Sequence, residues 1–182
     1  MKHFLILVLV IPCCFLYGQD STHKSETIDF IQRANKIVGE QFGNFNLTAA
    51  DQTTFSNANI SDKIAFVNFW FESCPPCISE LEGFNKLFDT LKDNRNFIFV
   101  SFTFDPDSTI TKLKEKYNIK YKVYHIDRTE CYRLNFNSGF PASFVLNKQG
   151  VIKYVTFGGF SEKEKATEQV MTQIYPKIVE QL

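Results

Sequence analysis

Two cysteines separated by two residues are the part of this sequence best suited to chemistry. Cys74 and Cys77 enclose Pro75-Pro76 and directly follow an apolar run at 64–70. The unpaired N–H groups and the dipole at a helix N-terminus stabilise a thiolate there. The second cysteine would lie one turn further along the same helix face, close enough to form a disulfide. The spacing therefore predicts that Cys74 is the attacking nucleophile and that Cys77 resolves the mixed disulfide.

Besides chance, two other interpretations of this pair compete with a redox centre. A structural disulfide that closes so short a loop would restrict the unfolded chain only slightly, so it would stabilise little. A zinc site would need a further pair of Cys or His ligands. Outside the N-terminal segment only His23, His125 and Cys131 are left for that role. We therefore favour a redox-active disulfide, and we expect no metal and no cofactor.

The start of the chain predicts export. A cationic beginning at 1–3 is followed by an apolar run at 4–11 and by the small residue Gly18, which is the pattern of a cleaved secretory signal. The apolar run is short for a membrane-spanning helix. A retained membrane anchor, or lipidation at Cys13 or Cys14, are the alternatives. We expect a periplasmic or otherwise extracytoplasmic protein.

Length, composition and charge bound the remaining possibilities. The chain has 182 residues, of which 44% are hydrophobic and 20 are Phe, so one domain can bury a substantial core. The 20 basic and 20 acidic residues cancel, and no basic run points to nucleic acid. We predict a signal peptide at 1–18, a short, partly mobile lead-in at 19–40 with a weak helical pattern, and one domain at 41–182.

Alternating strand-like and helix-like segments surround the cysteine pair. Apolar, β-prone runs predict buried strands at 64–70 and 96–104, and a third strand is predicted at 122–126. Amphipathic spacing predicts helices at 78–91, at 108–117 with Ser108 as its N-cap, and at 130–136. Strands separated by helices favour right-handed crossovers and a mixed sheet with helices on both faces.

The two ends of the predicted domain are built differently from its centre. Two runs at 142–146 and 151–155, joined by a turn at 147–150, predict a β-hairpin. Ser161 followed by Glu164 is a capping-box pattern that would begin a closing helix. Near the start, 43–47 reads as a small strand and 48–61 as a loop with one extended segment.

The segment at 67–80, Val-Asn-Phe-Trp-Phe-Glu-Ser-Cys-Pro-Pro-Cys-Ile-Ser-Glu, resembles the active-site run of the TlpA/ResA-like thiol–disulfide oxidoreductases, a branch of the thioredoxin superfamily. The resemblance extends from about Phe45 to the C-terminus. It includes Phe104-Asp105-Pro106, Gly139-Phe140-Pro141 and the turn at 147–150. It implies an α/β, thioredoxin-like fold, with a central mixed β-sheet flanked by helices on both faces and with an N-terminal extension.

The resemblance also implies roles for individual residues. Pro141 would form a cis bond beside Cys74, which exposes the backbone of Phe140 for pairing with a client peptide; a plain trans turn proline is the alternative. Glu80 shares the helix face of both cysteines and would relay the proton of Cys77; a solvated surface Glu is the alternative. Trp70 would join Phe140 in an aromatic substrate-binding rim.

The sequence departs from the family pattern at several positions. Asn68 stands where many thioredoxins have a buried acid, so proton handling shifts towards Glu80 or water. Ser73 replaces the usual aromatic residue before the first cysteine. Phe140 replaces a small or β-branched residue, and Glu82 stands where many members have a helix-kinking proline.

These observations predict an exported protein disulfide reductase that is a monomer, acts on disulfide-containing client proteins and receives electrons from a membrane donor. The sequence leaves the client open among apocytochrome c, a copper-site protein and misoxidised exported proteins. The reduction direction follows from the resemblance alone.

Two rival functions use the same cysteine pair. A copper chaperone would need His125, which is predicted to lie on a strand and to be structural. A thiol peroxidase would need an arginine near the thiolate, but Arg95, Arg128 and Arg133 are remote in sequence. Cys131 is either a small buried hydrophobe, which we favour, or a second resolving thiol.

Overall fold

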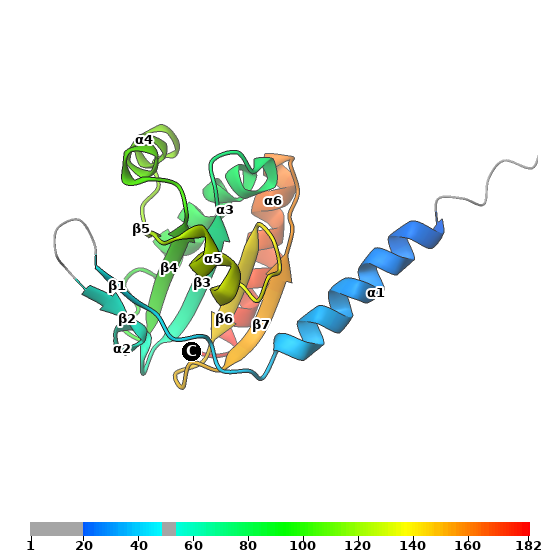
Figure 1. Ribbon diagram of the computed structural model, residues 1–182, viewed down its shortest axis with the longest axis horizontal. Coiled ribbons are helices and arrows are strands. Elements are labelled where there is room, and N and C mark those ends of the chain that lie inside the picture. The colour runs from blue at the N-terminus through cyan, green and yellow to red at the C-terminus, as the bar shows by residue number, and fades with distance from the viewer. Residues whose placement is uncertain (1–19, 49–53) are drawn as a thin grey trace, which may run out of the picture.

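The computed structural model describes residues 20–48 and 54–182, with side chains from residue 29 onwards (Figure 1). The predicted signal peptide at 1–18 lies outside the described residues. No helix within the described part of the chain is long and apolar enough to cross a membrane.

A five-stranded mixed sheet forms the centre of the domain, in the order β5-β4-β3-β6-β7. The three parallel strands are β3 (Ile64–Trp70), β4 (Phe97–Thr103) and β5 (Lys122–His125). The hairpin strands β6 (Ala142–Leu146) and β7 (Ile152–Phe157) are antiparallel to β3. Every residue of β3 is buried. This confirms that its continuous apolar run marks a central strand covered on both faces.

Helices cover both faces of this sheet (Figure 1). The helices are α3 (Pro75–Leu91), α4 (Asp107–Tyr117), α5 (Arg128–Leu134), α6 (Lys163–Gln169) and α7 (Tyr175–Val179), with a π-helical turn at Val170–Ile174 between the last two. The apolar faces of α3, of the π-helical turn and of α7 pack on one side of the sheet. The inner face of α5 packs on the other side. The predicted fold class, a thioredoxin-like mixed sheet between two helical layers, is confirmed.

Alternate residues of β3 build two separate cores. Phe66 and Trp70 point into the core under α3, whereas Val67 and Phe69 point into the core under α5. Aromatic rings fill much of both; the ring centroids of Phe66 and Phe99, for example, lie 4.8 Å apart in an edge-to-face contact. Burying a large aromatic side chain is among the strongest stabilising contributions a single residue makes. The abundant phenylalanines therefore account for much of the packing around the site.

The N-terminal lead-in is more regular than its sequence predicts. It forms the 18-residue helix α1 (Asp20–Ile37), where the sequence predicts only a weak helical pattern in a short lead-in. The end of this helix docks on the outer strand of the sheet, where Phe30 contacts Phe157 at 5.6 Å between ring centroids and Arg33 lies over the same ring. The weak periodicity of this segment underestimated the helix, because contacts with a strand more than 100 residues away also stabilise it.

The segment at 48–61 contains the one extended stretch that the sequence predicts, and a short helix in addition. β1 (Asn46–Thr48) pairs with β2 (Thr54–Ser56), and a short helix α2 (Asn57–Ile60) follows. Phe55 of β2 stacks on Tyr124 at 4.4 Å between ring centroids. This ring contact anchors the small sheet on the domain, although its polar, Thr- and Asn-rich sequence is typical of a loop.

Two predicted helix caps are wrong. α4 follows Pro106, whose carbonyl accepts the N–H groups of Thr109 and Ile110, so Ser108 lies inside the helix. α6 follows Glu162, not Ser161, and the predicted capping box does not form. The carbonyl of Ser161 instead accepts the hydroxyl of Ser79 at 2.7 Å. Ser161 thus links α3 to the segment before α6 through its backbone, and its side chain does not cap the helix.

We predict that Gly83→Val destabilises the fold. A Cβ atom at this buried position of α3 would lie 3.0 Å from the Val170 side chain and 3.1 Å from the Thr167 Cα atom. Overpacking of this kind typically costs about 1–3 kcal/mol. Urea unfolding should show that loss, whereas Thr90→Val, an exposed β-branched exchange on the same helix, should stay close to wild type. Equal unfolding free energies for the two variants would contradict the close helix contact.

Candidate active site

Cys74 and Cys77 form a disulfide at the N-terminus of α3, with their Cα atoms 5.3 Å apart. Cys74 is the N-cap residue, and the prolines that follow it occupy the first two helical positions. Proline is tolerated there because those backbone N–H groups have no partner within the helix. The first sulfur therefore belongs to the N-cap residue, at the positive end of the helix dipole, which favours the thiolate form of Cys74 over that of Cys77.

The loop that delivers Cys74 is held by an acid from the neighbouring strand. β3 and β4 are parallel with Trp70 opposite Thr103, so both strands end at the same edge of the sheet. Directly after β4, Asp105 Oδ2 accepts the backbone N–H of Glu72 at 2.7 Å and the hydroxyl of Thr103 at 2.9 Å. Asp105 is thus a positioning residue. In the sequence, Asp105 is notable only as part of the family resemblance at 104–106.

The Phe140–Pro141 peptide bond is cis, as the resemblance predicts. Ala142 pairs with Phe69 in the β3–β6 ladder, so this bond lies at the edge of the sheet where β3 ends. Pro141 is buried, whereas Phe140 is partly exposed. The structure therefore brings the cis bond to the same edge as the disulfide.

Glu80 lies inside the protein and not on the helix surface. It is 1% exposed, and Oε2 finds no hydrogen-bond partner among the described residues. Burial raises the pKa of this carboxyl group from 4.5 to about 8. Burial also raises the pKa of Tyr121, and the charge of ionised Glu80 adds to that shift. The carboxyl group of Glu80 is therefore protonated, and so uncharged, over much of the pH range around 7. The alternative prediction, a solvated Glu on the helix surface, does not describe this residue.

Gly159 covers Glu80 from the outside. A Cβ atom on this exposed glycine would lie 2.9 Å from Glu80 Oε1 and 3.3 Å from Pro141 Cγ. The neighbouring Gly158 N–H donates to the carbonyl of Pro141 at 2.8 Å. The glycine pair after β7 thus packs on the acid and on the cis proline at once. Local sequence patterns do not predict this contact, and the only signal for it is the pair of consecutive glycines after the hairpin.

Trp70 does not line the surface, contrary to the expectation that it belongs to a substrate-binding rim. Its side chain is 1% exposed, and its indole N–H donates to Ser101 Oγ at 2.8 Å. On the same face of β3, Asn68 Nδ2 donates a hydrogen bond to Ser143 Oγ at 3.1 Å. Trp70 points towards the core under α3 because it alternates with Phe69 along β3. It therefore supports the site from beneath.

Cys131 and His125 occupy structural positions. Cys131 is fully buried on α5, as the hydrophobic alternative predicts. Burial, with the nearby charges of Asp105 and Glu130, raises the pKa of its thiol to about 12, which disfavours a reactive thiolate. His125 Nδ1 lies 2.9 Å from the backbone oxygen of Asp105. Within residues 20–48 and 54–182 no group of three or more His, Cys, Asp or Glu side chains is placed to hold a metal ion.

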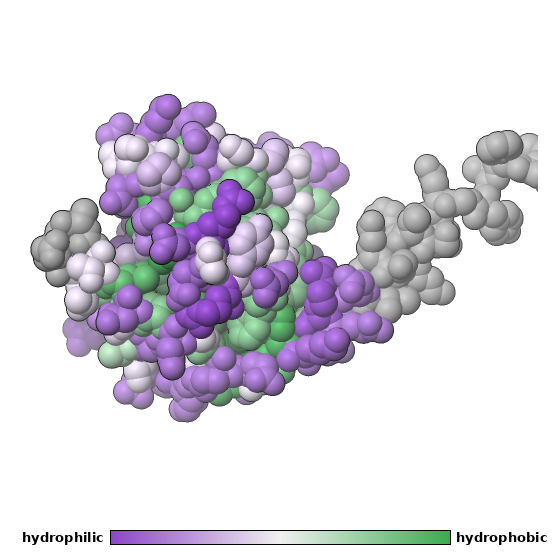
Figure 2. All heavy atoms as spheres, in the orientation of Figure 1, coloured by the Kyte–Doolittle hydropathy of each residue, from purple (hydrophilic) through white to green (hydrophobic). Residues whose placement is uncertain are grey.

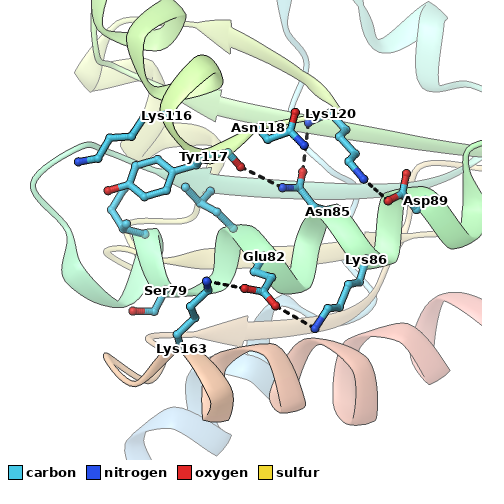
Figure 3. A pocket seen from close by; sticks show the side chains of 12 residues that line it. Ser79, Glu82, Asn85, Lys86, Asp89, Lys116, Tyr117, Asn118, Lys120 and Lys163 are labelled. Atoms are coloured by element: carbon cyan, nitrogen blue, oxygen red, sulfur yellow. Dashed lines mark hydrogen bonds and ion pairs between the residues drawn. The ribbon is translucent and has the colours of Figure 1, made fainter.

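A cavity of about 560 Å³ lies on the outer face of α3, beginning at Ile78 directly after the second cysteine (Figure 3). Glu82 forms ion pairs there with Lys86 at 3.0 Å and with Lys163 of α6 at 2.5 Å. Hydrogen bonds from these lysines lower the pKa of Glu82 to about 2. At the position where many relatives have a kinking proline, this chain thus has an acid that links α3 to α6.

Known proteins resemble this chain over most of its length. The thiol–disulfide oxidoreductase ResA of Halalkalibacterium halodurans is 26% identical over 152 residues, which are 81% of this chain and 83% of that protein. The thiol:disulfide interchange protein DsbE of Haemophilus influenzae is 28% identical over 180 residues, 97% and 95% of the two chains. The structure of a putative DsbE from Chlorobium tepidum shares the fold, with a TM-score of 0.65 at 18% identity over 78% of this chain and 97% of that one.

The fold, the paired cysteines and these relatives define a protein disulfide oxidoreductase of the thioredoxin type. The chain belongs to the AhpC/TSA family, whose family model matches residues 38–155.

We predict that Glu80 makes stability depend on pH. Its pKa is about 4.5 in a solvated chain and about 8 in the fold. Between these values the unfolded chain has lost the proton while the folded chain keeps it, so stability falls as pH rises through this window. The loss should be on the order of a few kcal/mol, at about 1.4 kcal/mol per pKa unit.

Urea unfolding of the oxidised protein from pH 5 to about 9 measures this effect. Glu80→Gln has no carboxyl group to ionise, so its stability advantage over wild type should grow with pH and level off above about pH 8. Glu168→Gln, which removes an exposed acid on α6, is the matched control and should follow wild type. If the free energy of unfolding changed with pH in the same way for wild type and Glu80→Gln, the carboxyl group would not be buried as described.

Proposed function

We propose that this chain is an exported protein disulfide reductase whose redox centre is the Cys74–Cys77 pair. One observation supports this most directly: the disulfide closes at a helix N-terminus on the same sheet edge as the cis bond before Pro141. The helix end lowers the energy of one thiolate, and the irregular loop beside it leaves backbone groups for a client. A purely structural disulfide would need neither feature.

The proposed reaction transfers two electrons from the reduced pair to a client. The Cys74 thiolate attacks one sulfur of a client disulfide, and the other client sulfur leaves as a thiolate. The Cys77 sulfur, once deprotonated, then attacks the sulfur of Cys74 and displaces the remaining client thiolate. The products are a client dithiol and the Cys74–Cys77 disulfide seen in the structure. A dithiol donor, which we propose to be a membrane protein, returns the two electrons.

Glu80 is the proposed proton carrier for the second step. It lies one turn beyond Cys77 on α3, and both side chains are 1% exposed. Its pKa of about 8 is close to the ordinary thiol value of about 8.5. A proton can therefore pass between the two groups with little difference in free energy, which is the condition for efficient general acid–base catalysis.

The client is proposed to bind along the cis-proline loop. The backbone of Phe140 would pair with an extended client segment, and the absence of an N–H on Pro141 leaves the sulfur of Cys74 without a competing donor. Trp70 contributes by supporting this edge from the core, since its indole is buried and hydrogen-bonded.

Export, domain limits and oligomeric state are part of the same proposal. The cationic start at 1–3 and the apolar run at 4–11 support a signal peptide at 1–18 and a periplasmic or extracytoplasmic location. The thioredoxin-like domain is proposed to extend over 41–182 and to act as a monomer. Among the client classes, proteins that mature through reduced cysteine pairs, such as apocytochrome c, fit a reductase.

We predict that Cys77→Ser traps clients as mixed disulfides. The first attack still occurs, but no thiol is left to release the client. The full chain should be expressed in an exporting host, quenched with an alkylating agent and separated on non-reducing gels. Client adducts that collapse on reduction are expected.

Two further variants define the result of this trapping experiment. Cys74→Ser combined with Cys77→Ser should trap nothing, and Cys131→Ser combined with Cys77→Ser should trap as well as the single variant. Absence of adducts, while Cys74 still reacts with a thiol reagent, would contradict the proposed client chemistry.

We also predict a reducing potential for the pair. A reductase should have a value near that of thioredoxin, about −270 mV, and far from the about −120 mV of a strong oxidant such as DsbA. Equilibration of the protein with defined ratios of reduced and oxidised dithiothreitol measures it. A potential near the oxidant value would reverse the proposed direction of electron flow while leaving the redox centre in place.

A further inference from the structure

Four aromatic side chains from four separate segments meet beside the disulfide. Phe71 follows β3, Phe104 follows β4, Tyr132 lies on α5, and Phe140 precedes the cis bond. We call this cluster the aromatic platform. All four residues are partly exposed, unlike most other aromatic residues near the sheet. Figure 2 shows hydrophobic surface gathered on this face, between α4 and α5 of Figure 1.

Phe140 is the centre of the aromatic platform. Its ring contacts Phe71, Phe104 and Tyr132 edge to face, with centroids 5.3, 5.5 and 5.4 Å apart. Phe71 and Phe104 stack on each other at 5.1 Å. Edge-to-face and stacked contacts of this kind hold rings in fixed orientations. The platform is therefore an ordered apolar surface.

The aromatic platform is continuous with the site of electron transfer. The carbonyl of Phe71 accepts the N–H of Cys74 at 3.2 Å, and Phe140 forms the cis bond with Pro141. A client sulfur that reaches Cys74 along the cis-proline loop thus brings its neighbouring residues over these rings.

The neighbouring Arg128 decides whether the aromatic platform favours apolar or cationic side chains. Aromatic faces attract both apolar groups and cations. The guanidinium carbon of exposed Arg128 lies 4.1 Å from the ring centroid of Phe104. Arg128 forms no ion pair or hydrogen bond with any other residue in the described part of the chain. Arg128 thus already occupies the position where a cation would bind on the aromatic platform. The positive charge of Arg128 repels a second cation.

We infer that the aromatic platform selects client segments in which aromatic or large aliphatic residues flank the reactive cysteine, and that Arg128 excludes basic ones. This inference rests on the proposed function, because it assumes that a client disulfide approaches Cys74. It adds the class of client sequence that the site prefers. Exposed apolar cystine segments occur in proteins that are not yet folded, so the preference would direct the reductase to unfolded clients.

A set of short peptides tests the inference with the reduced full-length protein. Each peptide has one cysteine blocked as a mixed disulfide with thionitrobenzoate, flanked on both sides by Phe, Leu, Ser or Lys. Cys74 attacks the peptide sulfur and thionitrobenzoate leaves, and Cys77 then releases the peptide thiol and closes the disulfide. Absorbance of the released thiolate gives the rate. Each rate is divided by the rate of the same protein with the small, uncharged hydroxyethyl disulfide.

The wild-type protein should favour the Phe peptide over the Ser peptide by about five- to tenfold, the size of one added aromatic contact. The Leu peptide should lie between them, and the Lys peptide should not exceed the Ser peptide. Phe104→Ala should reduce the Phe preference to about twofold or less. Arg128→Gln should raise the normalised rate of the Lys peptide several-fold, as expected when a cation position becomes free.

Arg95→Gln is the matched control for Arg128→Gln, because it removes an exposed arginine from the turn before β4, at the opposite edge of the sheet. It should leave all peptide ratios at wild-type values. Equal normalised rates for the Phe and Ser peptides in wild type would overturn the inference and leave the proposed function standing. A protein that reduces neither the peptides nor the small disulfide would overturn both.

Discussion

The register of β3 with its two neighbours is the constraint on which the rest of the site depends. Trp70 lies opposite Thr103 in the parallel pair, and Phe69 lies opposite Ala142 in the antiparallel pair. These two pairings bring three loops to one edge of the sheet: the loop before Cys74, the loop after β4 and the cis-proline loop. A slip of one residue in either ladder would exchange the faces of all side chains on the strand. The disulfide, the Asp105 hydrogen bonds and the aromatic platform all presuppose this one register.

The same register places polar groups inside an otherwise apolar layer. Ser101, Asn68, Ser143 and Thr156 lie opposite one another across four strands, and all are buried. Burying polar groups is costly unless they find partners. Asn68 and Ser143 satisfy part of this need with their mutual hydrogen bond, but Asn68 Oδ1 and Glu80 Oε2 have no partner among the described residues. The carboxyl group therefore avoids the larger cost of a buried charge by staying protonated.

Sequence patterns predicted the parts of this molecule that short-range order determines. The buried strands, the helix after the cysteines and the hairpin follow from apolar spacing within about ten residues. The cis bond before Pro141 was predicted through resemblance, not through physics. The docking of α1 and the cover of Glu80 by Gly159 were missed. Each depends on contacts between residues far apart in the chain, which local periodicity cannot reveal.

The two thiols differ in burial, and this difference fits the order in which they act in the proposed reaction. Cys74 is 4% exposed and is flanked by exposed Ser73 and Pro75, whereas Cys77 is 1% exposed and packed in the core under α3. In the proposed reaction the client approaches the first sulfur, which lies beside these exposed loop residues and at the helix N-terminus, whose dipole favours a thiolate. The second sulfur is protected from clients but remains one turn from Cys74 and one turn from Glu80. In the proposed reaction, client access, thiolate stabilisation and proton transfer thus belong to different residues along two successive turns of α3, and the proposed direction of attack follows from their positions.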